Sequence, residues 1–168
     1  MVKGELLSKL NEQINLENSS ANLYLSMSAW CSSKGYKGSA MFLFEHSKEE
    51  LEHMRRLFNY VNETGSVAKI TAIDAPETEF ETLKNVFETT FKHEQKITAK
   101  INDLVDVALS TKDFSTFKFL QWYVGEQHEE EALFKEILNL FDVIGTDGRG
   151  LFMIDREIEK IQANRFKK

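Results

Sequence analysis

The sequence predicts an all-α protein: a four-helix bundle of two antiparallel hairpins joined by a long crossover, followed by a short fifth helix. Three observations support this prediction. Four long segments carry apolar residues at helical spacing. Short links separate the first from the second segment and the third from the fourth, which makes each pair an antiparallel hairpin. About twenty residues separate the second segment from the third, enough to travel the length of a bundle.

The first hairpin is bounded by glycines. We expect its first helix over about residues 4–33, because Gly35 follows it and glycine is common just beyond the end of a helix. We expect the second helix over about residues 39–62, with Gly65 beyond it. The stretch that follows holds the only proline of the chain and shows little helical periodicity, so it is the crossover.

The second hairpin carries start signals. Thr78 and Glu81 match a capping box, which predicts a third helix over about residues 80–109. After a short link, Asp113 is a plausible N-cap for a fourth helix that reaches about residue 143 (113–143).

A shorter amphipathic segment ends the chain. Gly145 separates it from the fourth helix, and we expect it to be helical over about residues 149–162. Its apolar face needs a partner, which predicts contacts with the bundle or with other subunits of an oligomer. The residues of that face are Leu151, Ile154, Ile158 and Ile161.

Composition limits the class of protein. The 168 residues suffice for a single domain over residues 1–168, and 42% hydrophobic residues indicate a globular fold. The net charge of −6 argues against nucleic acid or an anionic membrane surface as a partner and suits a protein that attracts cations. No apolar run is long enough to span a bilayer. The absence of a signal-peptide pattern and the lone Cys31 favour a cytoplasmic location.

Each of the four long helices places a glutamate in the middle of its apolar stripe. These residues are Glu17, Glu50, Glu94 and Glu130. They lie about 15 to 18 residues from the turns of their hairpins, which is ~25 Å at the rise of an α-helix. His53 and Gln127 share the level of Glu50 and Glu130. If the hairpins pack side by side, all six side chains meet in the middle of the bundle.

Four buried carboxylates repel one another and lose their hydration, so they need cations. Glutamates with one histidine and one glutamine form an oxygen-rich site that suits iron or manganese, and zinc could occupy it adventitiously. Four carboxylates balance two divalent ions, and Glu50 is the best candidate for a bridge because His53 is its i+3 neighbour. The rival interpretation is a non-catalytic scaffold whose glutamates pair with basic groups. No Lys or Arg lies centrally in the stripes, but long-stemmed ones could reach in from outside.

Several neighbouring residues admit two interpretations. Tyr24 is either a redox-active phenol near the metals or a core aromatic, and Trp122 is packing or an electron donor. Three glutamates off the centre of the stripes form either a solvated face or a further cation site: Glu49, Glu126 and Glu129. The remaining histidines are expected at the surface or in packing: His46, His93 and His128.

The sequence resembles the non-haem bacterial ferritins over essentially its whole length. The resemblance rests on Glu17 followed by Tyr24, on EELEH at residues 49–53, on Glu94, and on WYVGEQHEEE at residues 122–131. The long crossover and the terminal fifth helix also match. The resemblance implies a ferritin-like bundle with a di-iron ferroxidase centre, in a hollow cage of twenty-four subunits that stores ferric oxyhydroxide. Fe²⁺ would be oxidised there by O₂ or H₂O₂.

The resemblance also implies a set of ligands. One iron would bind Glu17, Glu50 and His53. The other would bind Glu50, Glu94 and Glu130, with Gln127 adjacent. A third, weaker site would use Glu49, Glu126, Glu129 and Glu130.

Departures from related families narrow the assignment. Haem-binding bacterioferritins carry a methionine after the bridging glutamate, and Leu51 stands here, so no haem is expected. They and the di-iron oxygenases use Glu-x-x-His on both hairpins, whereas the second hairpin here has Gln127-x-x-Glu130. The single cysteine rules out the rubredoxin domain of rubrerythrins. A di-iron oxidase acting on organic substrates is the nearest rival, and it would not retain a mineral.

Overall fold

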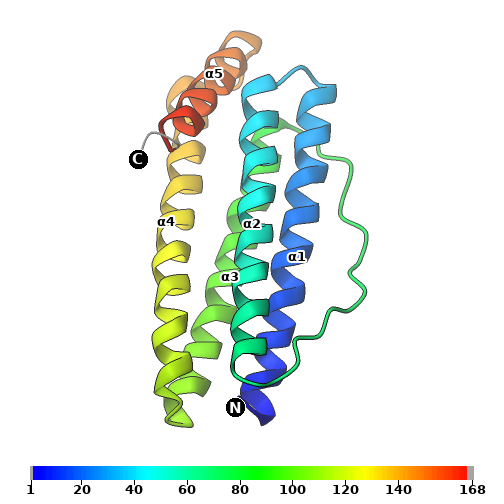
Figure 1. Ribbon diagram of the computed structural model, residues 1–168. Coiled ribbons are helices and arrows are strands. Elements are labelled where there is room, and N and C mark those ends of the chain that lie inside the picture. Colours follow the sequence, from blue (N-terminus) through cyan, green and yellow to red (C-terminus); the bar gives the residue numbers. More distant parts are fainter. Residues whose placement is uncertain (1, 166–168) are drawn as a thin grey trace.

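The computed structural model describes residues 2–165 and confirms the predicted fold class. Four long helices form two antiparallel hairpins, and a fifth lies across one end of the bundle (Figure 1). Over the described range no residue is in a β-strand. The helices are α1 (Gly4–Ser33), α2 (Lys37–Glu63), α3 (Leu83–Ser110), α4 (Phe114–Ile144) and α5 (Gly148–Arg165).

The crossover between α2 and α3 runs along the outside of α1 from one end of the bundle to the other (Figure 1). Two asparagines of α1 hold its first part. The backbone N–H of Lys69 donates to Asn11 Oδ1 at 2.7 Å, and that of Thr71 donates to Asn15 Oδ1 at 2.8 Å. Because the chain returns in this way before α3 begins, α2 and α3 run in the same direction.

The apolar core is divided in two by a polar layer. Toward the α5 end, one cluster contains Phe42, Phe87 and Phe134 among its buried residues. Toward the opposite end, a second cluster contains Leu10 and Leu57 among its own. On each long helix the central glutamate falls between the residues of the first cluster and those of the second. The four helices therefore bring their carboxylates to one level of the bundle.

The helix boundaries differ from the predicted ones where local hydrogen bonds decide. The capping box of Thr78 and Glu81 is wrong: α3 begins at Leu83, because the Asn85 N–H donates to the side chain of Thr82 at 3.0 Å. Asp113 caps α4 as predicted, by accepting from the Thr116 N–H at 3.0 Å.

The fifth helix, α5, is longer than predicted, since it covers Gly148–Arg165, and it is joined to the start of α2 by a buried carboxylate. Asp155 accepts from the backbone N–H of Gly38 at 3.0 Å and from that of Ser39 at 2.7 Å. Free N–H groups at the start of a helix favour a negative charge there. The contact also requires Gly38, because a Cβ atom at this position would lie 2.1 Å from the Asp155 carbonyl oxygen.

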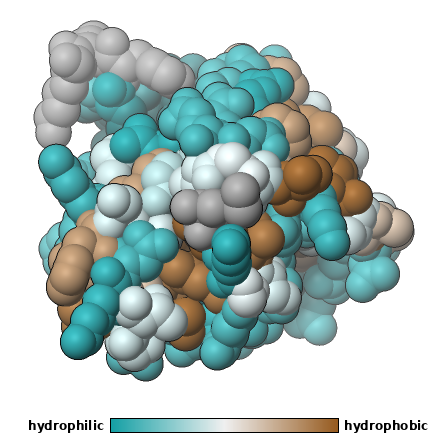
Figure 2. Space-filling model, turned by 60° about the horizontal axis from the view of Figure 1, so that its bottom comes forward, coloured by the Kyte–Doolittle hydropathy of each residue, from teal (hydrophilic) through white to brown (hydrophobic). Residues whose placement is uncertain are grey.

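Apolar side chains are exposed at the end of the bundle where the chain begins. Figure 2 looks toward this end and shows hydrophobic atoms among hydrophilic ones. Val67 in the crossover, and Leu109 and Phe114 on either side of the α3–α4 link, are each at least half exposed. Within residues 2–165, none of the helices combines the length and the apolar character needed to cross a membrane.

Candidate metal centre

The first half of the centre is formed by α1 and α2. Glu17, Glu50 and His53 are all buried, and each offers a ligand atom within 4.8 Å of the other two. Gln13, one turn before Glu17, donates to Glu17 Oε1 at 2.7 Å. The other oxygen, Oε2, is buried and has no hydrogen-bond partner among the described residues. An orphaned carboxylate oxygen beside a second carboxylate and an imidazole is a place where a cation fits.

Two residues of α4 support His53. The Tyr123 hydroxyl donates to the His53 carbonyl oxygen at 2.7 Å, which fixes the backbone at this level. The Trp122 ring packs edge-on against the His53 ring, with the centroids 5.3 Å apart. This contact fits the interpretation of Trp122 as a packing residue.

The second half of the centre joins α3 to α1 and α4. Glu94 is buried and accepts from the Tyr24 hydroxyl at one oxygen and from Gln127 Nε2 at the other, the latter at 3.0 Å. Tyr24 itself has no exposed surface. Tyr24 and Gln127 thus fix both oxygens of one carboxylate, and the tyrosine predicted as a site residue lies in contact with the polar layer.

Glu130 faces a histidine that the sequence reasoning did not select. Its Oε2 lies 2.7 Å from His46 Nε2, and His46 is completely buried. His46, Glu49 and Glu130 form a second set of ligand atoms within 4.8 Å of one another. His46 was expected at the surface or in packing, yet its spacing four residues before Glu50 places it on the same side of α2, a signal available in the sequence.

The electrostatics of the layer are unfavourable without a cation. Burial, reinforced by the charge of Glu50, raises the pKa of Glu17 well above its ordinary value. Burial and the neighbouring Glu94 do the same to the pKa of Glu50, and burial and Glu130 raise the pKa of Glu94. For Glu130 burial acts in the same direction, but contacts with His46 and Arg165 hold its pKa below the ordinary value. Divalent cations would stabilise the charged forms of Glu17, Glu50 and Glu94 and so lower their pKa values.

The three glutamates outside the stripes line one surface pocket of about 580 Å³. Glu49 and Glu126 are partly buried, and Glu129 is exposed. Burial raises the pKa of Glu126. The pocket also contains His53 and Arg165, so it reaches from the solvent to the edge of the buried centre.

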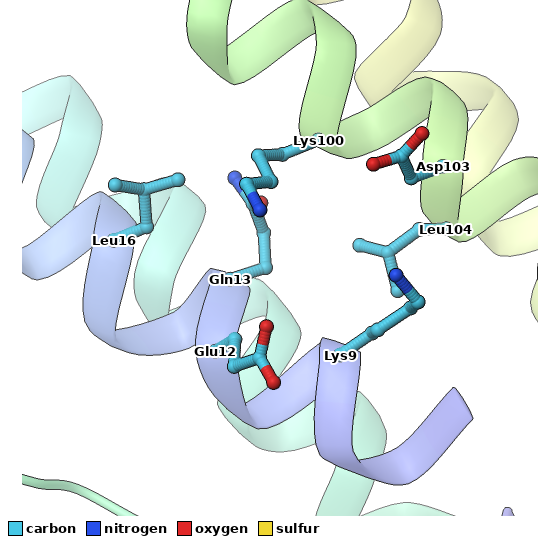
Figure 3. A pocket seen from close by; sticks show the side chains of 7 residues that line it. All are labelled: Lys9, Glu12, Gln13, Leu16, Lys100, Asp103 and Leu104. Atoms are coloured by element: carbon cyan, nitrogen blue, oxygen red, sulfur yellow. The ribbon is translucent and has the colours of Figure 1, made fainter. Parts of the chain in front are cut away.

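A second hollow approaches the centre from the other side. It lies between α1 and α3, and side chains of both helices line it (Figure 3). Gln13 contributes to its wall and also donates to Glu17, so this side chain links the hollow to the buried carboxylate. The carboxylates of Glu12 and Asp103 and the ammonium groups of Lys9 and Lys100 surround the opening.

Comparison with known proteins gives consistent results. The family described as Ferritin, a ferritin-like domain, matches residues 7–144. The chain is 54% identical over 158 residues to a probable bacterial non-heme ferritin-like protein of Haemophilus influenzae. The aligned region covers 94% of this chain and 96% of that protein. It is 49% identical over 167 residues to the bacterial non-heme ferritin of Campylobacter jejuni, and this alignment covers 99% of the chain and the whole of the relative.

Solved structures resemble the whole bundle. An open pore ferritin from the archaeon Archaeoglobus fulgidus superimposes with a TM-score of 0.92 at 39% identity, covering 95% of this chain and 98% of that one. A Chlorobium tepidum ferritin gives a TM-score of 0.85 at 48% identity with the same coverage.

Proposed function

The chain belongs to the ferritin family, whose function is iron storage, and on that premise we propose that it oxidises Fe²⁺ at the buried centre and stores the product as a ferric mineral. One observation carries the proposal. Four helices bring four buried carboxylates to one level, where one oxygen of Glu17 is without a partner and three of the four have raised pKa values. Such a layer is stabilised by cations and is costly without them.

We propose two iron positions. Glu17, Glu50 and His53 would hold one Fe²⁺ ion, since their ligand atoms already lie together. Glu50, Glu94 and Glu130 would hold the other, with Gln127 beside it and Glu50 as the bridge. Glu130 contacts His46 and Arg165 in this structure, so it must exchange these partners to serve as a ligand.

Two Fe²⁺ ions held side by side supply two electrons, so O₂ is reduced to the peroxide level: 2 Fe²⁺ + O₂ + 2 H⁺ gives 2 Fe³⁺ + H₂O₂. Peroxide can serve as a further oxidant. Anionic oxygen ligands favour the higher charge of Fe³⁺, which drives the oxidation. In this proposal Tyr24 orients Glu94 by its hydrogen bond and supplies an electron to the centre.

A third iron position and an assembly complete the proposal. Glu49, Glu126 and Glu129 would hold an ion in the surface pocket, together with Glu130. Exposed apolar side chains on α2 and α5 support a homo-oligomer, which we propose is a cage of twenty-four subunits in the cytoplasm. These side chains are Met41, Phe44, Phe152 and Met153.

Size measurement coupled to iron loading tests the function. Light scattering and electron microscopy of the purified protein should show a hollow particle that fills with ferric mineral when Fe²⁺ and air are added. A protein that oxidises iron but retains no mineral would instead be an oxidase. A protein that binds no stoichiometric Fe²⁺ under anaerobic conditions would be a scaffold.

A further inference from the structure

Arg165 lies in the last described turn of α5 and reaches back to the metal centre. Its guanidinium donates to Glu49 Oε2 at 2.8 Å and lies 3.4 Å from Glu130 Oε1. A third contact joins its Nη1 to His46 Nδ1 at 3.0 Å. The guanidinium can only donate, so the imidazole accepts at Nδ1 and directs its other nitrogen at Glu130. One arginine thus contacts every member of the second ligand set.

The surroundings of Arg165 are strongly acidic. The surface pocket that it lines holds four carboxylates and, among its lining residues, one guanidinium. Those carboxylates belong to Glu49, Glu126, Glu129 and Glu136. A single positive charge therefore neutralises only part of the negative charge of the pocket. A divalent cation would interact more favourably with these carboxylates than the arginine does.

The fold determines where Arg165 can reach. Asp155 joins α5 to the first N–H groups of α2, and Gly38 allows the two backbones to approach closely. From Asp155 the helix continues for ten residues, or ~15 Å, toward the middle of the bundle. A rigid helix fastened in its middle carries its last turn to the pocket, so Arg165 does not arrive there as a freely moving surface side chain.

We propose that Arg165 is a built-in cation that occupies the third metal position until a divalent cation displaces it. The arginine stabilises Glu49 and Glu130 in the metal-free subunit and competes with the metal for both. Since displacement frees the last turn of α5, occupancy of the pocket is coupled to the position of that turn. This inference rests on the proposed third iron position.

Zn²⁺ is the appropriate probe because it binds without redox chemistry. We would titrate the assembled, metal-free protein with Zn²⁺ by calorimetry and compare the wild type with Arg165→Gln and Arg165→Lys. The matched control is Arg156→Gln, which removes an exposed arginine from the same helix; among the described residues this arginine pairs with Glu159.

In Arg165→Gln the weakest class of Zn²⁺ site should bind about three- to tenfold more tightly, because partly exposed ion pairs with arginine are modest competitors. Arg165→Lys should fall between the two, since it keeps the charge and loses the fork of donors. Arg156→Gln should match the wild type. Unchanged or weaker binding in Arg165→Gln would overturn the inference.

A second measurement needs no variant. Hydrogen exchange of the last turn of α5 should become faster in the wild type when Zn²⁺ fills the weakest site, and unchanged or slower exchange would contradict displacement. The two proposals fail separately. A wild type that binds no Zn²⁺ refutes both, whereas a wild type that binds Zn²⁺ and an Arg165→Gln variant with the same affinities refute only the role of the arginine.

Discussion

Glu17→Gln should stabilise the metal-free protein while it weakens metal binding. Ligand oxygens of Glu17 and Glu50 lie within 4.8 Å of each other in a buried layer. Two unit charges at that separation repel by about 3.5 kcal/mol at an effective dielectric constant of about 20. Because the native state relieves part of this repulsion by retaining a proton, we expect a gain of about 1–3 kcal/mol at pH 7.5. Gln13 can still donate to the new amide oxygen, so packing is preserved.

The gain should depend on pH in a definite direction. The pKa values of Glu17 and Glu50 are raised in the folded protein, so the folded state binds more protons than the unfolded one above pH 4.5. The stability of the metal-free wild type therefore falls as the pH rises from about 4.5 through the native pKa values. Glu17→Gln removes part of this fall, and its advantage should be smaller at pH 5 than at pH 7.5.

Differential scanning calorimetry at fixed protein concentration, with chelator and then with Zn²⁺, measures both effects. A gain of 1–3 kcal/mol corresponds to an increase in Tm of about 3–9 °C for a chain of this size. Zn²⁺ should raise the Tm of the wild type far more than that of the variant. Glu12→Gln, on the exposed side of the same helix, is the control and should change little. A metal-free Glu17→Gln that melts below the wild type at pH 7.5, or gains more at pH 5, would refute the reasoning.

Four further substitutions test the other parts of the structure. Glu50→Ala and Glu130→Ala should each slow the initial oxidation of Fe²⁺, measured by stopped-flow absorbance, by roughly a hundredfold or more. Gel filtration should show that assembly is intact. An undiminished rate in both variants would reject the ligand assignment. Tyr24→Phe should leave the bundle folded and slow oxidation several-fold, because Glu94 loses one of its two donors; unchanged kinetics would make Tyr24 a packing residue. Gly38→Ala should lower the stability by about 1–3 kcal/mol, because the added Cβ meets the Asp155 carbonyl and pushes α5 from α2. An unchanged melting temperature would show that the two helices can move apart at little cost.

The sequence was sufficient for the fold class and for the level at which the glutamates lie. Helical periodicity gives the direction of a side chain, and its distance from a turn gives its height, so Glu17, Glu50 and Glu94 could be brought together without coordinates. The start of α3 was missed because two threonines compete for the cap, and only the local backbone shows that Thr82 accepts from Asn85.

The partners of Glu130 depend on packing: helical spacing places His46 on the same side of α2 as Glu50 but does not give the residue that it meets. His46 meets Glu130 only because α2 and α4 face each other across the layer, which the periodicity of a single helix does not contain. Arg165 is placed by the angle of α5, and that angle follows from the buried contact of Asp155 with Gly38 and Ser39. Such pairings depend on how whole helices pack against one another.

The divided core gives the subunit an unusual distribution of strength. Most single domains are most stable at the centre and fray at the ends. Here the two apolar clusters stabilise the helices on either side of a central polar layer, which is less stable without a cation. When cargo is absent, transient opening should begin at mid-height, beside Glu50, and spread outward. If the proposed iron sites fill, this layer should become the firmest part of the bundle, and the rigidity of each subunit would then report whether it carries iron.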